Sequence, residues 1–247
     1  MRRIGRGLPV FLAIVALLGA WQLAGMLIGF PAYILPLPVD IAMQGINAWP
    51  LLGAAALTTF VETVVGFLIG SAIGVVLALV LALAPALEVS LLPLVIAVNS
   101  VPAVAFVPLA LIWFGLGMAS KLAMAAIAVS FPVLLNMLAG LKRPSPEAIN
   151  LLRSFGSSWF GILWRLRIPT AMPSLVIGLR VGIGRAAIAV IVAEMLGAYT
   201  GLGQTIYQAT AQVDYLTVWA AVLIASAGSL LLYGALVTMD RRLVWWR

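Results

Sequence analysis

Six long apolar runs divide this chain, and each is long enough to cross a lipid bilayer as a helix. A membrane-spanning helix needs about 20 mostly apolar residues, because the hydrocarbon core of a bilayer is ~30 Å thick. The six runs cover residues 8–30, 57–83, 91–118, 122–141, 173–198 and 215–239. The sequence therefore predicts an all-α polytopic membrane protein, with six transmembrane helices in a single domain over residues 1–247.

The composition excludes a soluble domain and most enzyme chemistry. Hydrophobic residues make up 64% of the chain and charged residues only 9%, too few to solvate the surface of a soluble domain. The absence of Cys and His excludes thiol nucleophiles, disulfides, Cys/His metal sites and a Ser-His-Asp triad. The only lysines, Lys121 and Lys142, are followed by Leu and Arg, so a P-loop is excluded as well. We therefore expect no enzyme activity, catalytic residue, metal or cofactor in this chain.

The basic residues indicate how the helices are oriented. The formal net charge is +7, but Lys and Arg gather in short stretches between the apolar runs, and we expect no nucleic-acid partner. The groups are Arg2, Arg3 and Arg6; Lys142, Arg143, Arg153, Arg165 and Arg167; and Arg241, Arg242 and Arg247. Because Lys and Arg accumulate in cytoplasmic loops, both termini and segment 142–172 are expected in the cytoplasm. The first run is too long for a signal peptide and no A-x-A cleavage site follows it, so we expect it to be retained.

The third run is expected to be a broken helix. It contains three prolines, and Pro102 follows the polar pair Asn99-Ser100. Proline removes a helical donor and restricts the residue before it, so a break is predicted at residues 99–102. A broken helix in a membrane lines a water-filled path or packs against other protein, and the sequence leaves both open.

Charged residues inside the runs are the other candidates for a transport path. Glu62, Lys121 and Glu194 are expected at similar depth near the outer side, either as a structural Lys–Glu pair or facing the substrate. Arg180 and Arg185 lie nearer the cytoplasmic half of the fifth run. The residues predicted to line a translocation path are Asn99, Ser100, Lys121, Ser130, Asn136, Arg180, Arg185 and Glu194. Glycines four residues apart in the second and fifth runs predict a tight bundle or a subunit contact.

Segment 142–172 is predicted to form a helix–Gly–helix element. Ser145 can cap a first helix that begins at Pro146, Gly156 interrupts it, and Ser157-Ser158 can cap a second helix. The second helix is expected to end at Ile168-Pro169, just before the fifth run. Such an element can lie in the membrane interface or present a surface to a cytoplasmic partner.

This segment resembles the cytoplasmic loop of permease subunits of ABC importers, whose consensus is E-A-A-x3-G-x9-I-x-L-P. With Gly156 on the consensus glycine, Ile168-Pro169 fall on L-P and Leu166 on the I, while Asn150-Leu151-Leu152 replace E-A-A. Glu147 lies three positions upstream of that triplet. The resemblance implies that the ATPase-coupling residues are Glu147, Asn150, Leu152, Gly156, Leu166, Ile168 and Pro169.

The rest of the chain resembles permeases of the nitrate, sulfonate and taurine type, in an ordered set of strings over about residues 35–247. The strings lie at residues 101–103, 108–117, 131–136, 178–180, 184–186, 192–197 and 201–203. The resemblance implies a multi-pass permease in the inner (plasma) membrane of a prokaryote. Its partners would be a second copy of the chain, two cytoplasmic ABC ATPases that hold ATP and Mg, and an extracytoplasmic solute-binding protein. The implied cargo is a small anion; the alternatives are a pyrimidine thiamine precursor or a flavin, or an ATP-independent secondary transporter.

Overall fold

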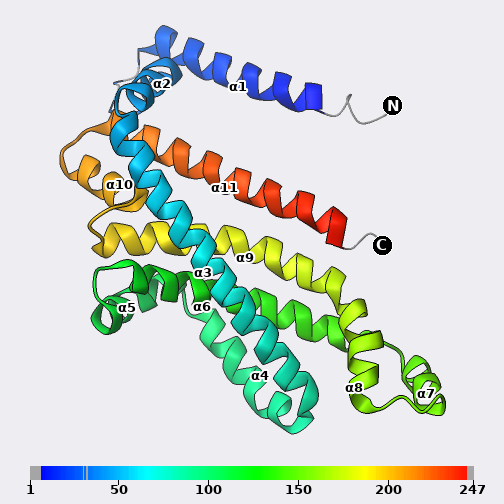
Figure 1. Cartoon of the computed structure of the whole chain (residues 1–247). Helices are drawn as coiled ribbons and strands as arrows, with labels where there is room; N and C mark the ends of the chain where they lie inside the picture. The colour runs from blue at the N-terminus through cyan, green and yellow to red at the C-terminus, as the bar shows by residue number, and fades with distance from the viewer. Residues whose placement is uncertain (1–6, 30, 32, 244–247) are drawn as a thin grey trace.

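The computed structural model describes residues 7–29, 31 and 33–243, and in this part of the chain helices are joined by short loops (Figure 1). The predicted all-α class is confirmed. The expected basic residues Arg2, Arg3, Arg6 and Arg247 lie outside the described residues. The helices are α1 (Gly7–Ile28), α2 (Pro38–Asn47), α3 (Trp49–Leu83), α4 (Pro85–Ser100), α5 (Val107–Phe114), α6 (Met118–Leu141), α7 (Pro146–Ser154), α8 (Trp159–Ile162), α9 (Ile168–Gly197), α10 (Leu202–Ala211) and α11 (Tyr215–Leu243).

Four of the described helices are long and apolar enough to cross a bilayer: α3, α6, α9 with α8, and α11. The bent pair α4–α5 is a fifth candidate span, and the apolar helix α1 corresponds to the first predicted run. Helix α3 begins at Trp49 and α4 at Pro85, both earlier than the apolar runs, because Pro50 and Pro85 supply favourable first-turn positions. The count of six spans stays a prediction.

The break predicted in the third run is confirmed. Helix α4 ends at Ser100, Val101 is extended, and a 3₁₀ turn (Ala103–Phe106) leads into α5. The two halves meet at an angle of 92°. Pro102 causes the break, because it cannot donate the backbone bond that would continue α4. Helix α4 buries none of its residues in this chain, so its surface is left for lipid or another subunit.

Helices α3, α6 and α9 form the centre of the bundle. Glycines of α3 and α9 lie directly against α6: a Cβ on Gly70 would lie 2.5 Å from the Ala126 carbonyl oxygen, and one on Gly178 would lie 2.8 Å from that of Pro132. Small residues let the backbones approach this closely, and van der Waals contact then holds the helices together. The tight bundle predicted from the glycine spacing is confirmed.

Figure 1 shows that the start of α1, the end of α11 and the α7–α8 element lie toward one end of the bundle. Helices α2, α5 and α10 lie at the other end. The described start of α1 and end of α11 therefore lie toward the same end as the α7–α8 element. That the two termini and segment 142–172 share one side of the membrane stays a prediction.

Candidate functional site

Helices α7 and α8 form the predicted helix–Gly–helix element. Ser145 Oγ accepts a hydrogen bond from the Ala148 N–H (3.3 Å), and Ser158 Oγ accepts one from the Gly161 N–H (3.2 Å). Gly156 has a φ of +75°, a left-handed conformation that glycine adopts without strain. Both predicted caps and the interruption at glycine are thus confirmed.

The same element exposes a surface of large apolar side chains. Phe155 is 77% exposed, Phe160 63% and Trp164 57%, and the rings of Phe160 and Trp164 lie 6.0 Å apart. Leu151 and Trp159 are exposed as well. Exposed apolar patches of this kind mark an interface with protein or membrane. We call these five residues the aromatic surface.

The predicted coupling residues divide by exposure around this surface. Glu147 and Asn150 are exposed on α7, whereas Leu152, Leu166, Ile168 and Pro169 are half-buried. The Ser145 hydroxyl and the backbone at the start of α7 stabilise the carboxylate of Glu147 and lower its pKa below the ordinary value. A carboxylate at this position also interacts favourably with the N-terminal end of the helix dipole.

The predicted end of the second helix at Ile168-Pro169 is wrong. Leu163–Arg167 form a π-helical turn that joins α8 directly to α9, so one helix runs from Trp159 to Gly197. The wider turn accommodates Pro169, which lacks an N–H. Beside it, the Thr170 hydroxyl donates to the Leu166 carbonyl oxygen one turn earlier (2.6 Å). Trp159, Phe160 and Trp164 are therefore connected to a membrane span without a flexible joint, whereas Leu151 and Phe155 precede the interruption at Gly156.

A buried polar cluster ties α3, α9 and α10 together at the opposite end. The Thr59 hydroxyl lies 2.8 and 3.0 Å from the two carboxylate oxygens of Glu194, and it accepts a hydrogen bond from the Leu202 N–H (2.8 Å). The Gly203 N–H also donates to Glu194 (2.8 Å). Thr59 and Glu194 are almost completely buried. Thr59 and Gly203 were not among the predicted site residues, although both lie in the same sequence segments as Glu62 and the G-L-G string.

Lys121 makes no ion pair within the described residues. Its ammonium group donates instead to the carbonyl oxygens of Leu116, Gly117 and Gly197, the last of which ends α9. Cations are favourable at such helix C-termini. Lys121 and Glu62 do line one cavity of about 350 Å³, and the Glu62 carboxyl lies beside that of Glu194. The three charged side chains thus lie near one another, whereas a direct Lys–Glu pair is not formed in the described residues.

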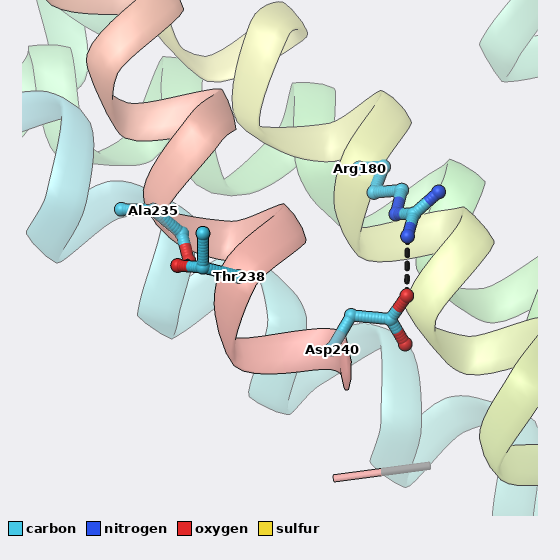
Figure 2. A network of polar contacts seen from close by, with 4 residues as sticks. All are labelled: Arg180, Ala235, Thr238 and Asp240. Atoms are coloured by element: carbon cyan, nitrogen blue, oxygen red, sulfur yellow. Dashed lines mark hydrogen bonds and ion pairs between the residues drawn. The ribbon is translucent and has the colours of Figure 1, made fainter. Parts of the chain in front are cut away.

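Arg180 pairs with Asp240, which joins α9 to α11 (Figure 2). Asp240 is buried, and it was not predicted as the partner of Arg180. The sequence hint at this partner was its position, an acidic residue immediately before Arg241 and Arg242. One turn earlier in α11, the Thr238 hydroxyl donates to the Ala235 carbonyl oxygen (2.7 Å).

Three predicted path residues meet at the break between α4 and α5. Asn99, Ser100 and Arg185 line a cavity of about 290 Å³, and the Arg185 guanidinium donates to the Asn99 side-chain oxygen (3.3 Å). The other two polar candidates, Ser130 and Asn136, bond carbonyl oxygens of their own helix, α6. The roles of all eight path residues in transport stay predictions. Within the described part of the chain, no three carboxylate side chains lie together as a metal site would require.

The comparison with known proteins decides the family. Residues 70–245 match the family described as binding-protein-dependent transport system inner membrane component. The chain belongs to this family. A probable ABC transporter permease of Haemophilus influenzae is 32% identical to this permease, over 97% of its chain and 98% of the relative. A riboflavin transport system permease of Chloroflexus aurantiacus is 36% identical over 97% and 90%. A putative aliphatic sulfonates transport permease of Bacillus subtilis is 27% identical over 98% and 87%.

The permease is thus a multi-pass inner-membrane component of an ABC importer, a non-enzymatic part of such a system. The family and the transport function expected from the sequence are confirmed, and the relatives include the sulfonate type. Membership of this family also argues against the alternative of an ATP-independent secondary transporter.

Proposed function

We propose that this permease works as a homodimer that imports a small organic or inorganic anion of the sulfonate or taurine kind. Two separate cytoplasmic ATPase subunits, which hold ATP and Mg, dock on segment 142–172. An extracytoplasmic binding protein delivers the solute to the end of the bundle that carries α2, α5 and α10. Both chain termini lie in the cytoplasm.

The observation that carries this proposal is the aromatic surface on α7 and α8. The surface lies toward the end of the bundle at which α1 starts and α11 ends, and it presents Phe155, Phe160 and Trp164 to an external partner. Aromatic side chains dominate the energetics of protein interfaces. A cytoplasmic ATPase whose groove accepts these rings covers the apolar side chains that α7 and the start of the α8–α9 helix expose.

The continuous helix from Trp159 to Gly197 supplies the route by which ATPase closure acts on the spans. A movement of α8 shifts α9 as one body, because the π-helical turn keeps the backbone bonded across the junction. Helix α9 carries Arg185 near its middle and Glu194 near its far end. The docking movement therefore changes the lining of the cavity at the α4–α5 break.

The anion is favoured over the other solutes by charge. Arg185 places a positive group in the cavity at the α4–α5 break. The relative named for aliphatic sulfonates supports this cargo. The relative named for riboflavin keeps a flavin as the second candidate, and a pyrimidine thiamine precursor remains in the same importer class.

Co-purification and ATPase assays test the proposal. We expect the tagged permease to retain an ABC ATPase whose activity rises when binding protein and solute are added. Phe160→Ala removes an exposed ring from α8 and should lower the stimulated activity about tenfold or more, because aromatic interface residues contribute about 2 kcal/mol or more. Leu231→Ala, which removes an even more exposed apolar side chain from α11, is the control. Transport without an ATPase, or a fully active Phe160→Ala complex, would contradict the docking role.

A further inference from the structure

The cavity at the α4–α5 break combines an apolar wall with one charged group. Its volume is about 290 Å³. The wall comes from the end of α4, the 3₁₀ turn, α6 and α9, and includes Val98, Phe106, Phe131 and Ile188. Among the described lining residues, Arg185 is the one charged side chain. A mostly apolar cavity with a few convergent polar groups is the usual form of a small-molecule site.

Most of the N–H donors of Arg185 make no hydrogen bond within the described residues. A guanidinium carries five N–H donors, and the one hydrogen bond recorded for Arg185 goes to the Asn99 side-chain oxygen at 3.3 Å. Among the described residues, no carboxylate lies within ion-pair distance of it. Arg180, five positions earlier on the same helix, is paired with Asp240. The two arginines of α9 therefore have different surroundings: Arg180 forms an ion pair with Asp240, and Arg185 faces the cavity.

The position of Arg185 in the membrane also requires a polar neighbour. It lies near the middle of α9, between the exposed side chains Val181 and Ile188 on the same face. A charged group at this depth is too costly to leave in lipid, so it faces a water-filled path or is covered by protein. A water-filled path agrees with the broken backbone of α4 beside it, which needs the same protection from lipid.

We propose that this cavity is a solute-binding site within the permease itself. Arg185 and Asn99 hold the anionic head group of a small solute, and its short apolar body packs against the surrounding aromatic and aliphatic side chains. A guanidinium suits this role because it binds two oxygens of a carboxylate or similar oxyanion through parallel hydrogen bonds. The inference rests on the proposed function, because it requires a transported anion.

The size of the cavity narrows the solute class. Its volume lies at the lower limit of small-molecule sites, which range from about 300 to 1,000 Å³. A short alkanesulfonate or a similar small acid fits within such a space. Selectivity is then shared between the binding protein and the permease.

Equilibrium binding to the purified permease–ATPase complex, without binding protein, tests the site. The probes are ethanesulfonate, its neutral amide analogue and riboflavin. We expect ethanesulfonate alone to bind. Arg185→Gln should weaken its binding about ten- to hundredfold, as loss of a charge-assisted hydrogen bond does, and Arg185→Lys should weaken it less. Ile188→Trp keeps the charge, fills the cavity from an exposed position and should also abolish binding. Asp40→Asn, a charge removed from the exposed start of α2, should leave it unchanged.

The outcomes separate this site from the proposed function. A complex that takes up ethanesulfonate in proteoliposomes with its binding protein, but binds none without it, keeps the function and overturns the site. Equal binding by wild type and Arg185→Gln overturns the site as well. A complex that takes up riboflavin and no anion overturns the proposed cargo, and the site with it.

Discussion

Replacing Thr59 with Val tests whether the buried cluster of Thr59, Glu194 and Leu202 holds α10 against the bundle. The two side chains have nearly the same shape, so the substitution removes hydrogen bonds without leaving a cavity. The hydroxyl both donates to the Glu194 carboxylate and accepts from the Leu202 N–H, at 2.8 Å each. At full burial neither partner can find water instead.

The expected cost follows from those two bonds. A buried hydrogen bond contributes about 0.5–1.5 kcal/mol, and a buried N–H left without a partner costs about 1–3 kcal/mol. The sum is about 2 kcal/mol or more. For a chain of this length, 1 kcal/mol shifts the melting temperature by about 2–4 °C, so Thr59→Val should lower it by about 4–8 °C.

Thermal unfolding in detergent, followed by tryptophan fluorescence, measures this shift. Thr59→Ser keeps the hydroxyl and should lose much less stability than Thr59→Val. If the two variants unfold at the same temperature, the hydroxyl contributes no more than the methyl group that Thr59→Ser removes, and the argument from hydrogen bonding is refuted. A Thr59→Val variant as stable as wild type would refute it as well.

Three further predictions concern other parts of the molecule. Gly203→Ala should lower the melting temperature as much as a severe core substitution, because its Cβ would occupy the space of a backbone carbonyl of α9; wild-type stability would contradict this packing. Replacing either Arg180 or Asp240 alone should destabilise the protein by about 2 kcal/mol or more, and the double replacement by apolar residues should cost less than the sum, as a double-mutant cycle of melting temperatures can measure. The pKa of Glu147 is lowered because its charged carboxylate stabilises the start of α7. This stabilisation should be fully present above the unfolded-state pKa of about 4.3, and it should be lost as the pH falls through the lower folded-state pKa. Carboxyl NMR should show the lowered midpoint, and Ser145→Ala should move it back toward the ordinary value.

Local rules predicted those features that depend on neighbouring residues. The caps at Ser145 and Ser158 follow from side chains that can accept backbone N–H bonds a few positions later. The break after Ser100 follows from Pro102, and the close contact of α3 and α9 with α6 follows from glycine spacing. Each of these effects acts within one or two helical turns, so a single sequence contains it.

Contacts between distant segments could not be predicted in the same way. Asp240 lies sixty residues from Arg180, and nothing local indicates that α11 brings the two together. A pair between Lys121 and a glutamate was one of the two roles expected for this residue, but three backbone carbonyl oxygens lie closer and accept its hydrogen bonds. Pro169 was expected to end a helix, because the local rule does not include the π-helical turn that accommodates it.

The π-helical turn Leu163–Arg167 also sets the angle, around the helix axis, between side chains on α8 and side chains on α9. It places one residue more between the aromatic surface and α9 than an unbroken α-helix would, and each residue of an α-helix turns the direction of its side chains by about 100°. The direction in which Phe160 points, relative to Arg185, therefore depends on the π-helical turn between them, Leu163–Arg167. Two permeases of equal helix length that differ by one residue here would present their docking surfaces to an ATPase from different directions.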